Sequence, residues 1–199
     1  VPSQDMILGS YYLTKLKEGD LGEGKIFGSI EEVALAYENR VVGLHSKISL
    51  KHNGTWIKDT TIGRAIFNSI LPSEMDYVND LIDKKKLTNI VNQCYLIVGN
   101  YKTVIFLDNL KDLGFNMATQ SGLSISVSDV LIPHEKDNIL SNAFDKVEDI
   151  KRKFDRHVLT EGERYNKVID VWTHTTNHIA QVMEDELRKD NKGFNALSM

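Results

Sequence analysis

Cysteine and proline are scarce in this chain, and neither sign of charge is in large excess. Cys94 is the single cysteine among 199 residues, which excludes an internal disulfide framework and a zinc site built from cysteines, and suits a reducing compartment. The formal net charge is −4. This value argues against a free-standing nucleic-acid binder, because such binding depends on clustered lysine and arginine side chains that neutralise phosphates.

Long apolar runs are missing as well. No uninterrupted stretch approaches the ~20 residues that a membrane-spanning helix needs, and the first residues, VPSQDM, contain neither a basic leader nor an apolar signal core. We therefore expect a cytoplasmic protein with no membrane partner. The chain begins at Val1 and stops at Met199 without a closing cap or charged tail, so we expect both ends to be cuts through a longer polypeptide.

The residues that are present suit an ordinary globular chain. Hydrophobic side chains make up 41% of the sequence and charged ones 26%, which is typical of soluble domains rather than disordered chains. A chain of this length buries roughly two thirds of the surface that its unfolded form exposes. One or two small domains are therefore expected.

Short elements are predicted for the first third of the chain. An apolar helix is expected over residues 5–13, and the glycine-rich segment 19–24 is expected to be a loop. Ser29 and Glu32 have the spacing of a capping box, which predicts the start of a second helix there. An apolar face formed by residues 33, 34 and 37 follows this start.

A small antiparallel ribbon is predicted next. Apolar residues alternate over 42–50, residues 52–54 (His-Asn-Gly) are typical of a hairpin turn, and residues 55–61 return. Two helices that pack on each other are expected after the ribbon, the first ending at Gly99 and the second at Gly122. Their apolar stripes are formed by Leu87, Ile90, Val91, Cys94 and Ile97, and by Val104, Leu107, Leu110, Gly114, Met117 and Ala118.

The last third of the chain predicts a long antiparallel helical hairpin. A capping box at Thr160 and Glu163 opens its second helix, and the short connection requires the two helices to run antiparallel. The two stripes comprise Ile139, Leu140, Ala143, Phe144, Val147, Ile150 and Phe154, and Tyr165, Val168, Ile169, Trp172, Thr176, Ile179, Met183 and Leu187. The expected fold class is α+β and mainly helical: a small antiparallel β ribbon with packed helices, then this hairpin.

One motif favours nucleotide chemistry. Gly19, Gly24 and Lys25 have the spacing of a phosphate-binding P-loop, but Ile26 stands where the motif needs Ser or Thr to bind magnesium. A rival interpretation takes residues 104–108 as a buried strand that ends in a metal-holding Asp108. The helical stripe that runs through this segment favours a helix instead. An independent P-loop-like nucleotide hydrolase stays open as an alternative.

Other chemistry-bearing residues have simpler interpretations. His174 and His178 are four apart on a predicted helix, a spacing that can hold a metal, but both lie off its stripe, so two solvated histidines are expected. Cys94 lies on a core stripe and is expected to be a small buried hydrophobe. No nucleophile–base set or close carboxylate pair is recognisable. A stand-alone helical-hairpin adaptor formed by residues 133–199 is a further alternative.

Several collinear segments resemble bacterial RNA polymerase beta-prime, the largest catalytic subunit of that enzyme. They occur in the same order and at similar spacing, and the resemblance covers essentially all 199 residues. The segments are residues 1–14 (VPSQDMILGSYYLT), 22–24 (GEG), 59–64 (DTTIGR), 102–104 (KTV) with 114–115 (GF), 160–172 (TEGERYNKVIDVW) and 193–195 (GFN).

The resemblance implies two regions and a shared reaction. Residues 1–132 correspond to the pore region (domain 3 type), and residues 133–199 to the funnel with the helical hairpin at the rim of the secondary channel (domain 4 type). The implied reaction is DNA-templated RNA synthesis from nucleoside triphosphates, a nucleotidyl transfer by the whole complex. The aspartates that hold magnesium lie upstream of Val1 in the family, and the zinc sites lie outside this stretch. The resemblance therefore implies magnesium and zinc in the parent subunit, but no cofactor, metal or catalytic residue in this chain, which is expected to be inactive alone.

Partners follow from the same resemblance. They are the alpha, beta, omega and sigma subunits, the DNA template and RNA, nucleoside triphosphates in transit, and Gre-type factors that reach into the secondary channel. A cytoplasmic, nucleoid-associated location is implied.

Individual residues are carried over from the same family. Gln4 is expected near the catalytic chamber, and Glu163 on the factor-docking rim. Tyr165, Asn166 and Lys167 match a rim segment at which factors dock. Asn166 and Lys167 lie off the apolar stripe and are expected to be exposed, with partner contact as an open alternative. Tyr165 lies on the stripe, where packing is the simpler interpretation.

A possible alarmone site is also implied by the resemblance. Ile105, Asp108, Asn166 and Lys167 match residues that bind guanosine tetraphosphate in some lineages. Asp112, however, stands where those lineages carry a tyrosine. Its carboxylate would repel a polyphosphate, so alarmone binding is not expected here.

Overall fold

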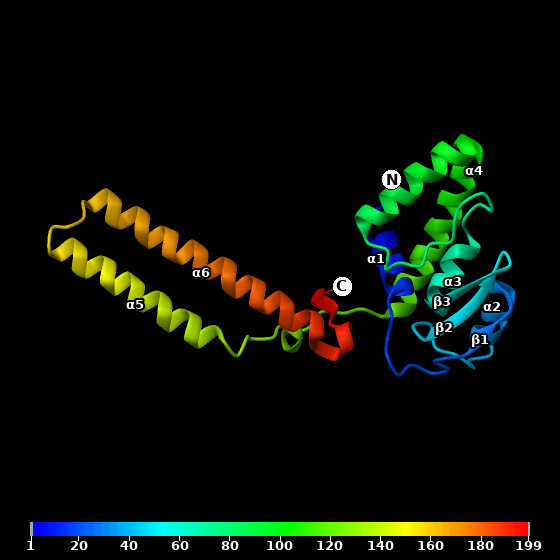
Figure 1. Cartoon of the computed structure of the whole chain (residues 1–199), viewed down its shortest axis with the longest axis horizontal. Helices are drawn as coiled ribbons and strands as arrows, with labels where there is room; N and C mark the ends of the chain where they lie inside the picture. The colour runs from blue at the N-terminus through cyan, green and yellow to red at the C-terminus, as the bar shows by residue number, and fades with distance from the viewer. Residues whose placement is uncertain (1, 199) are drawn as a thin grey trace. The chain divides into compact units, whose positions relative to one another are not determined.

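The computed structural model describes residues 2–198, which divide into two compact units, 2–124 and 125–198 (Figure 1). Each unit is described by itself. The division at residue 132, which was drawn on a family's regions, stays a prediction. In the described part of the chain no helix is both long and apolar enough to cross a membrane.

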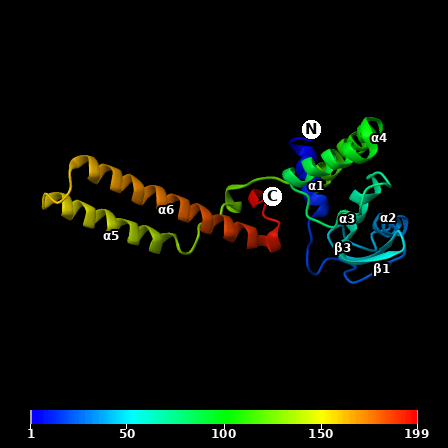
Figure 2. The same cartoon turned by 45° about the horizontal axis from the view of Figure 1, so that its top comes forward.

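The first unit contains most of the secondary-structure elements. They are α1 (Asp5–Thr14), β1 (Ile26–Phe27), α2 (Ile30–Glu38), β2 (Lys47–His52), β3 (Thr55–Thr61), α3 (Ile62–Ser69) and α4 (Lys84–Ser121). Figure 2 shows the strands and α2 on one side of this unit and α1 with α4 on the other. The second unit contains η1 (Val127–Asp129), α5 (Lys136–Asp155), α6 (Glu161–Lys189), η2 (Asp190–Gly193) and η3 (Ala196–Ser198). The α+β, mainly helical fold class is confirmed.

The predicted ribbon is the β2–β3 hairpin. Asn53 and Gly54 connect the two strands with φ values of 47° and 81°, as a tight two-residue turn requires. The strand before the turn begins at Lys47 rather than at residue 42, because residues 42–46 form bends and turns. Strand β1 was not predicted; it pairs in parallel with β2 and makes the sheet three-stranded. Two residues are too few to show an alternating pattern.

Two helix starts in the first unit are local hydrogen-bond motifs, one that was predicted in part and one that was not predicted. The Oγ of Ser29 accepts a hydrogen bond from the backbone N–H of Glu32 (3.3 Å), as expected. The carboxylate of Glu32, however, accepts from the N–H of Gly28 (2.6 Å) instead of closing the box on Ser29. The α3 helix was not predicted, and its first turn is capped by the Oγ1 of Thr61.

The predicted break at Gly99 is confirmed, and it divides α4 into arms of residues 84–98 and 100–121. Gly99 has a φ of 74°, outside the helical region, so the chain changes direction there. The arms share one hydrophobic core, and the Oγ1 of Thr103 contacts the Sγ of Cys94 at 3.6 Å. Cys94 is fully buried, as predicted.

The apolar stripes predicted for α4 were wrong about which residues are buried at some positions. Phe106 is buried in place of Val104, which is 49% exposed, and Ile97 next to the break is also exposed. The non-helical residue Gly99 interrupts the 100° rotation per residue, so a stripe cannot be continued through it.

The first unit has two hydrophobic cores and close backbone packing where its helices cross. One cluster lies among α1, α3 and α4, and the other between the sheet and α2 with α3. Where α1 crosses α4, a Cβ on Gly9 would lie 1.9 Å from the carbonyl oxygen of Gly114. At a second crossing, a Cβ on Gly63 would lie 1.7 Å from the carbonyl oxygen of Leu13. Glycine is needed at both positions because the backbones touch.

Arg64, within one of the resembling segments, ties three parts of the first unit together. Its Nε donates to the carbonyl oxygen of Thr14 (3.1 Å), and its Nη1 donates to the carbonyl oxygen and the Oδ1 of Asn79 (3.2 and 3.1 Å). These bonds hold α1, α3 and the segment before α4 in register. The side chain therefore has a structural role in this fold.

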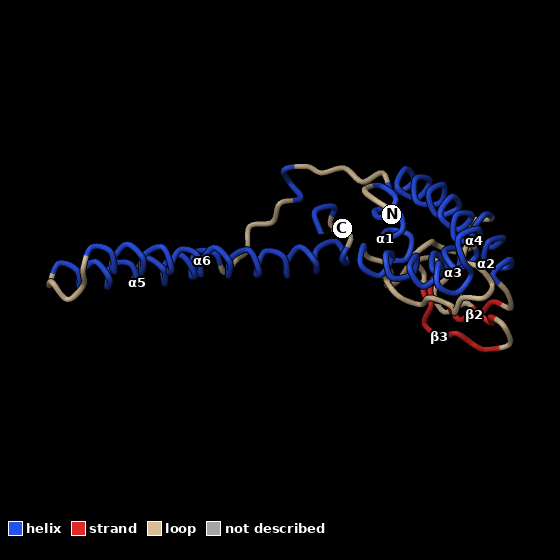
Figure 3. Tube along the Cα trace, turned by 90° about the horizontal axis from the view of Figure 1, so that it is seen from above, coloured by secondary structure: helices blue, strands red, loops and turns tan. Residues whose placement is uncertain are grey.

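The second unit confirms the antiparallel hairpin. Helices α5 and α6 run side by side along their length (Figure 1), and they overlap when seen from above (Figure 3). Ala143 and Leu187 are its buried helix residues in the described part of the chain. The predicted stripe of α6 was partly wrong, because Tyr165, Ile169 and Thr176 are exposed while Arg164, Val171 and Thr175 are half-buried. Phe144 on α5 is also exposed rather than buried.

Candidate functional site

The turn that joins α5 to α6, with the first helical turn of α6, is the tip of the hairpin. The predicted capping box is confirmed there: the backbone N–H of Thr160 donates to the Oε2 of Glu163 (2.9 Å), and the N–H of Glu163 donates to the Oγ1 of Thr160 (3.3 Å). The Thr160 hydroxyl also donates to the same carboxylate (2.9 Å). The backbone and hydroxyl hydrogen bonds from Thr160 hold the pKa of the Glu163 carboxyl below its ordinary value. Glu163 therefore serves the helix start, whatever else it contacts.

The tip also depends on Arg164, for which the sequence predicted no role. The guanidinium of Arg164 lies 5.1 Å from the ring centre of Phe154 on α5 and forms an ion pair with Glu161 (3.4 Å). Stacking of a guanidinium on an aromatic ring contributes about 0.5–2 kcal/mol. The contact closes the end of the hairpin. An arginine between a glutamate and a tyrosine gives no periodic apolar signal, so the sequence pattern could not reveal this contact.

Tyr165, Asn166 and Lys167 follow directly on the exposed surface of α6. Exposure of Asn166 and Lys167 was predicted and is confirmed. The packing interpretation of Tyr165 was wrong, since this side chain is 60% exposed. The tip therefore presents an aromatic ring, an amide and an ammonium group within one turn, a combination suited to protein contacts.

Ile105 and Asp108 lie in the first unit, on the second arm of α4, whereas Asn166 and Lys167 lie in the second unit. Ile105 borders a hollow of about 330 Å³, beside which Lys102 forms an ion pair with Glu74. The four proposed alarmone residues are thus distributed over two units.

The charges around Asp108 oppose polyphosphate binding. Lys111 lies between two carboxylates, 3.6 Å from Asp108 and 3.5 Å from Asp112. One ammonium group cannot neutralise both, so an anionic ligand would meet excess negative charge. The absence of alarmone binding at these residues stays a prediction.

Gln4 occupies the position immediately before α1 and is exposed. Its φ is 45°, and its carbonyl oxygen accepts hydrogen bonds from the N–H groups of Ile7 (2.9 Å) and Leu8 (3.1 Å). The backbone of Gln4 therefore starts the helix, while its side chain makes no capping hydrogen bond.

The P-loop interpretation finds no support in the fold. The loop of residues 19–25 leads into β1, whereas a P-loop leads into a helix whose N-terminus faces the phosphates. The Nζ of Lys25 donates to the carbonyl oxygen of Val41 (3.3 Å). Residues 104–108 are helical rather than a strand, as the stripe indicated.

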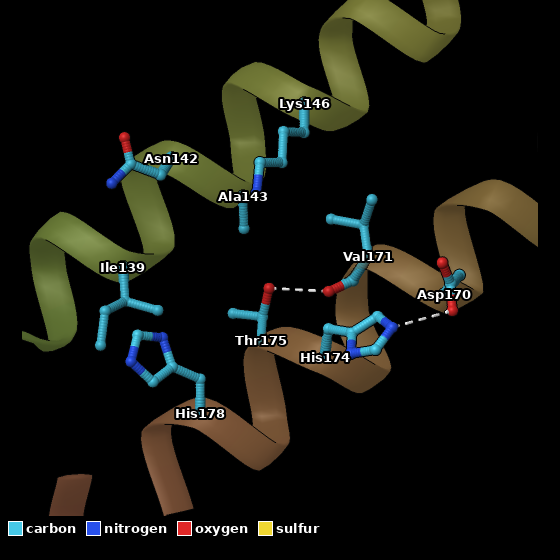
Figure 4. Close-up of a pocket in the computed structure, with 9 residues that line it drawn as sticks. All are labelled: Ile139, Asn142, Ala143, Lys146, Asp170, Val171, His174, Thr175 and His178. Carbon is cyan, nitrogen blue, oxygen red and sulfur yellow. Dashed lines mark hydrogen bonds and ion pairs between the residues drawn. The ribbon is translucent and has the colours of Figure 1, made fainter.

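A groove of about 430 Å³, lined by both polar and apolar side chains, lies between α5 and α6 on one flank of the hairpin (Figure 4). His174 and His178 border it, and their rings turn away from each other, the former toward Asp170 (3.3 Å) and the latter toward Ile139. Across residues 2–198 no group of three or more His, Cys, Asp or Glu side chains is arranged to hold a metal ion. Both histidines are exposed, as predicted.

Comparisons with known proteins identify the class of this chain. Residues 1–130 match the family described as RNA polymerase Rpb1, domain 3. The chain is 42% identical over 200 residues to "DNA-directed RNA polymerase subunit beta'" of Salinibacter ruber, covering 99% of this chain and 14% of that subunit. The subunit of the same name from Desulforamulus reducens is 44% identical over 193 residues, covering 97% of this chain and 16% of that subunit. The subunit of the same name from Aquifex aeolicus is 44% identical over 193 residues, covering 96% of this chain and 12% of that subunit.

The match of residues 1–130 shows that the chain contains an RNA polymerase domain. The chain belongs to the family of RNA polymerase beta' subunits, as the collinear resemblance predicted. It spans only 12–16% of the length of these three relatives.

Proposed function

We propose that this chain is part of the beta' subunit of a DNA-directed RNA polymerase, a nucleotidyltransferase that transcribes DNA into RNA from nucleoside triphosphates. The observation that carries the proposal is the match of nearly the whole chain, 96–99%, to subunits of that name in three bacteria. The enzyme acts on the DNA of the nucleoid, in the cytoplasm, with the alpha, beta, omega and sigma subunits as its other chains.

Within that enzyme the chain acts as scaffold rather than as catalyst. Its first unit is a wall of the pore beside the active centre, with Gln4 nearest the catalytic chamber and nucleoside triphosphates passing in transit. The backbone contact of Gly9 with Gly114 supports this role, because closely packed helices make a stiff wall. Magnesium for catalysis and structural zinc belong to other segments of the parent subunit.

The second unit is the rim of the secondary channel, where Gre-type factors dock on the hairpin tip. Support comes from the exposed side chains of Tyr165, Asn166 and Lys167, which follow a helix start held firmly by Thr160 and Glu163. A rigid helix end that presents exposed polar and aromatic groups loses little conformational entropy on binding.

Factor docking at the rim can be tested in a polymerase assembled with the full-length subunit. The double variant Asn166→Ala and Lys167→Ala is expected to lower factor-stimulated RNA cleavage in stalled complexes about tenfold, since losing a good interface contact costs more than about 1.4 kcal/mol. Factor-free elongation should be unchanged, because neither residue contacts the reacting atoms in this proposal.

The control is a double variant of the same two residue types on α5, Asn142→Ala and Lys146→Ala. It removes exposed groups that border the groove between the two helices. It should keep the full factor response. Equal losses in both double variants would show that the tip is not the docking site.

A further inference from the structure

The segment of residues 15–24, which we call the strap, follows α1 and has no helix or strand of its own. It lies against residues 41–47 of the same unit, where the N–H of Gly43 donates to the carbonyl oxygen of Leu21 (2.7 Å). The approach is close, since a Cβ on Gly43 would lie 2.2 Å from the carboxylate of Asp20. Among the described residues, neither hydrophobic core cluster includes one from the strap. Hydrogen bonds are therefore its main attachment.

His45 ties the strap at three points. Its Nδ1 lies 3.0 Å from the carbonyl oxygen of Lys15, and its backbone N–H donates to the Oδ2 of Asp20 (3.2 Å). Its carbonyl oxygen accepts from the backbone N–H of Lys17 (3.1 Å). Because a carbonyl oxygen only accepts hydrogen bonds, the Nδ1 of His45 carries a proton and donates it to Lys15.

The surroundings of the His45 ring disfavour a second proton. The residue is only 6% exposed, and its ring meets that of Tyr12 edge-on, with ring centres 4.6 Å apart. Burial lowers the pKa of His45, and the ammonium groups of Lys17 and Lys15 act in the same direction. The hydrogen bond to Lys15 and the carboxylate of Asp20 act in the opposite direction, but they do not outweigh burial, so the pKa stays below its ordinary value.

This environment links the strap to pH. A buried imidazolium is costly, whereas water solvates it once the strap lifts from the ring. The attached strap thus binds fewer protons than the released one. Its attachment is fully stable above the ordinary histidine pKa of about 6.5 and weakens as the pH falls below that value. A segment outside the hydrophobic cores opens at a smaller free-energy cost than the whole unit.

We propose that the strap is an acid-sensitive switch: uptake of a proton by His45 releases residues 15–24 from residues 41–47 while the rest of the first unit stays folded. The glycine-rich part of the strap, residues 19–24, then serves as a segment that fits closely when attached and moves away when released. The proposal concerns this chain alone and does not rest on the polymerase function proposed above.

Release of the strap is measurable by NMR hydrogen exchange of the full 199-residue chain at pH 7.5 and 5.5. Rates are expressed as protection factors, so that the intrinsic pH dependence of amide exchange is removed. The amides of Lys17 and Gly43 should lose protection severalfold, and at most about tenfold, because pH 5.5 is one unit below the ordinary histidine pKa. Amides within α3 and α4 should keep their protection. Carboxyl groups titrate near pH 4 and stay ionised over this range.

Two variants separate His45 from other titrating groups. His45→Asn places an amide donor near the position of Nδ1 but does not titrate, so its strap should be equally protected at both pH values. The matched control is His52→Asn, which removes the other histidine of the first unit and should retain the loss at pH 5.5.

The proposal is also testable without any substitution. In the unaltered chain, the midpoint of the protection loss should coincide with the titration of the His45 ring, followed by its nitrogen chemical shifts. Unchanged strap protection at pH 5.5, a loss that persists in His45→Asn, or midpoints that differ would each overturn the proposal. An equal loss throughout the first unit would overturn it in favour of global unfolding.

Discussion

At the scale of one residue, the carboxylate of Glu163 is occupied by the capping box and is therefore less available to a docking partner. Its carboxylate accepts hydrogen bonds from the backbone N–H and the hydroxyl of Thr160, and these bonds lower its pKa. The capping box was readable from sequence because its two members are only three residues apart. The exposed Tyr165 was assigned to the wrong face, because a stripe read from sequence does not show which part of it α5 covers.

The lowered pKa predicts a pH-dependent contribution to stability. Because the folded pKa lies below the unfolded one, ionised Glu163 stabilises the hairpin above the unfolded pKa of about 4.3, and this stabilisation is lost as the pH falls through the folded value. Urea unfolding of the chain and of Glu163→Gln, monitored by helicity, should therefore differ at neutral pH and converge in acid. Glu161→Gln shares the same helix terminus but not the capping box, and should show a smaller difference. A difference that persists unchanged in acid would contradict the prediction.

At the scale of elements, the crossing of α1 and α4 determines which glycines can be replaced. Glycine inside a helix normally costs about 1 kcal/mol relative to alanine. At Gly9 the sign should reverse, because the added Cβ would lie 1.9 Å from the carbonyl oxygen of Gly114 and the helices would have to separate. Gly9→Ala is expected to destabilise the first unit by about 1–3 kcal/mol, measured by urea unfolding with Trp56 fluorescence in a Trp172→Phe background.

Gly162 provides the control for this prediction. It is helical, and a Cβ there would meet no atom within 4 Å, so Gly162→Ala should leave the Trp56 transition unchanged. If the unchanged chain and Gly9→Ala had equal urea midpoints, the crossing of α1 and α4 would accommodate the added Cβ without loss of stability.

The helix breaks were predictable and the helix faces were not. Gly99 and Gly122 both adopt positive φ and end or break a helix, which the glycine itself indicates. By contrast, burial of Phe106 instead of Val104 depends on how the second arm of α4 rotates after the break. That rotation is decided by contacts with α1 and the first arm, which are remote in sequence.

At the scale of the whole molecule, the structure separates the polymerase assignment from an independent hydrolase. A stand-alone hairpin adaptor is likewise unsupported, because the match to beta' subunits extends over 96–99% of the chain. Since the loop of residues 19–25 enters a strand, no helix N-terminus is available to bind phosphates there. The isolated chain is therefore expected to show no magnesium-dependent ATP turnover in a phosphate-release assay, and Lys25→Ala should leave any weak ATP binding unchanged. Tight magnesium-dependent binding that Lys25→Ala abolishes would restore the hydrolase hypothesis.

The amino-acid sequence by itself determined the capping box at Thr160, the breaks at Gly99 and Gly122, the antiparallel hairpin and the family, because each depends on neighbouring residues or on collinear motifs. Only the tertiary structure decided the pairing of β1 with β2, the backbone contact of Gly9 with Gly114 and the exposure of Tyr165 and Ile169 on α6. These features depend on which remote segments meet in space. A linear pattern of apolar residues does not specify that, since the same stripe can face a core or a partner.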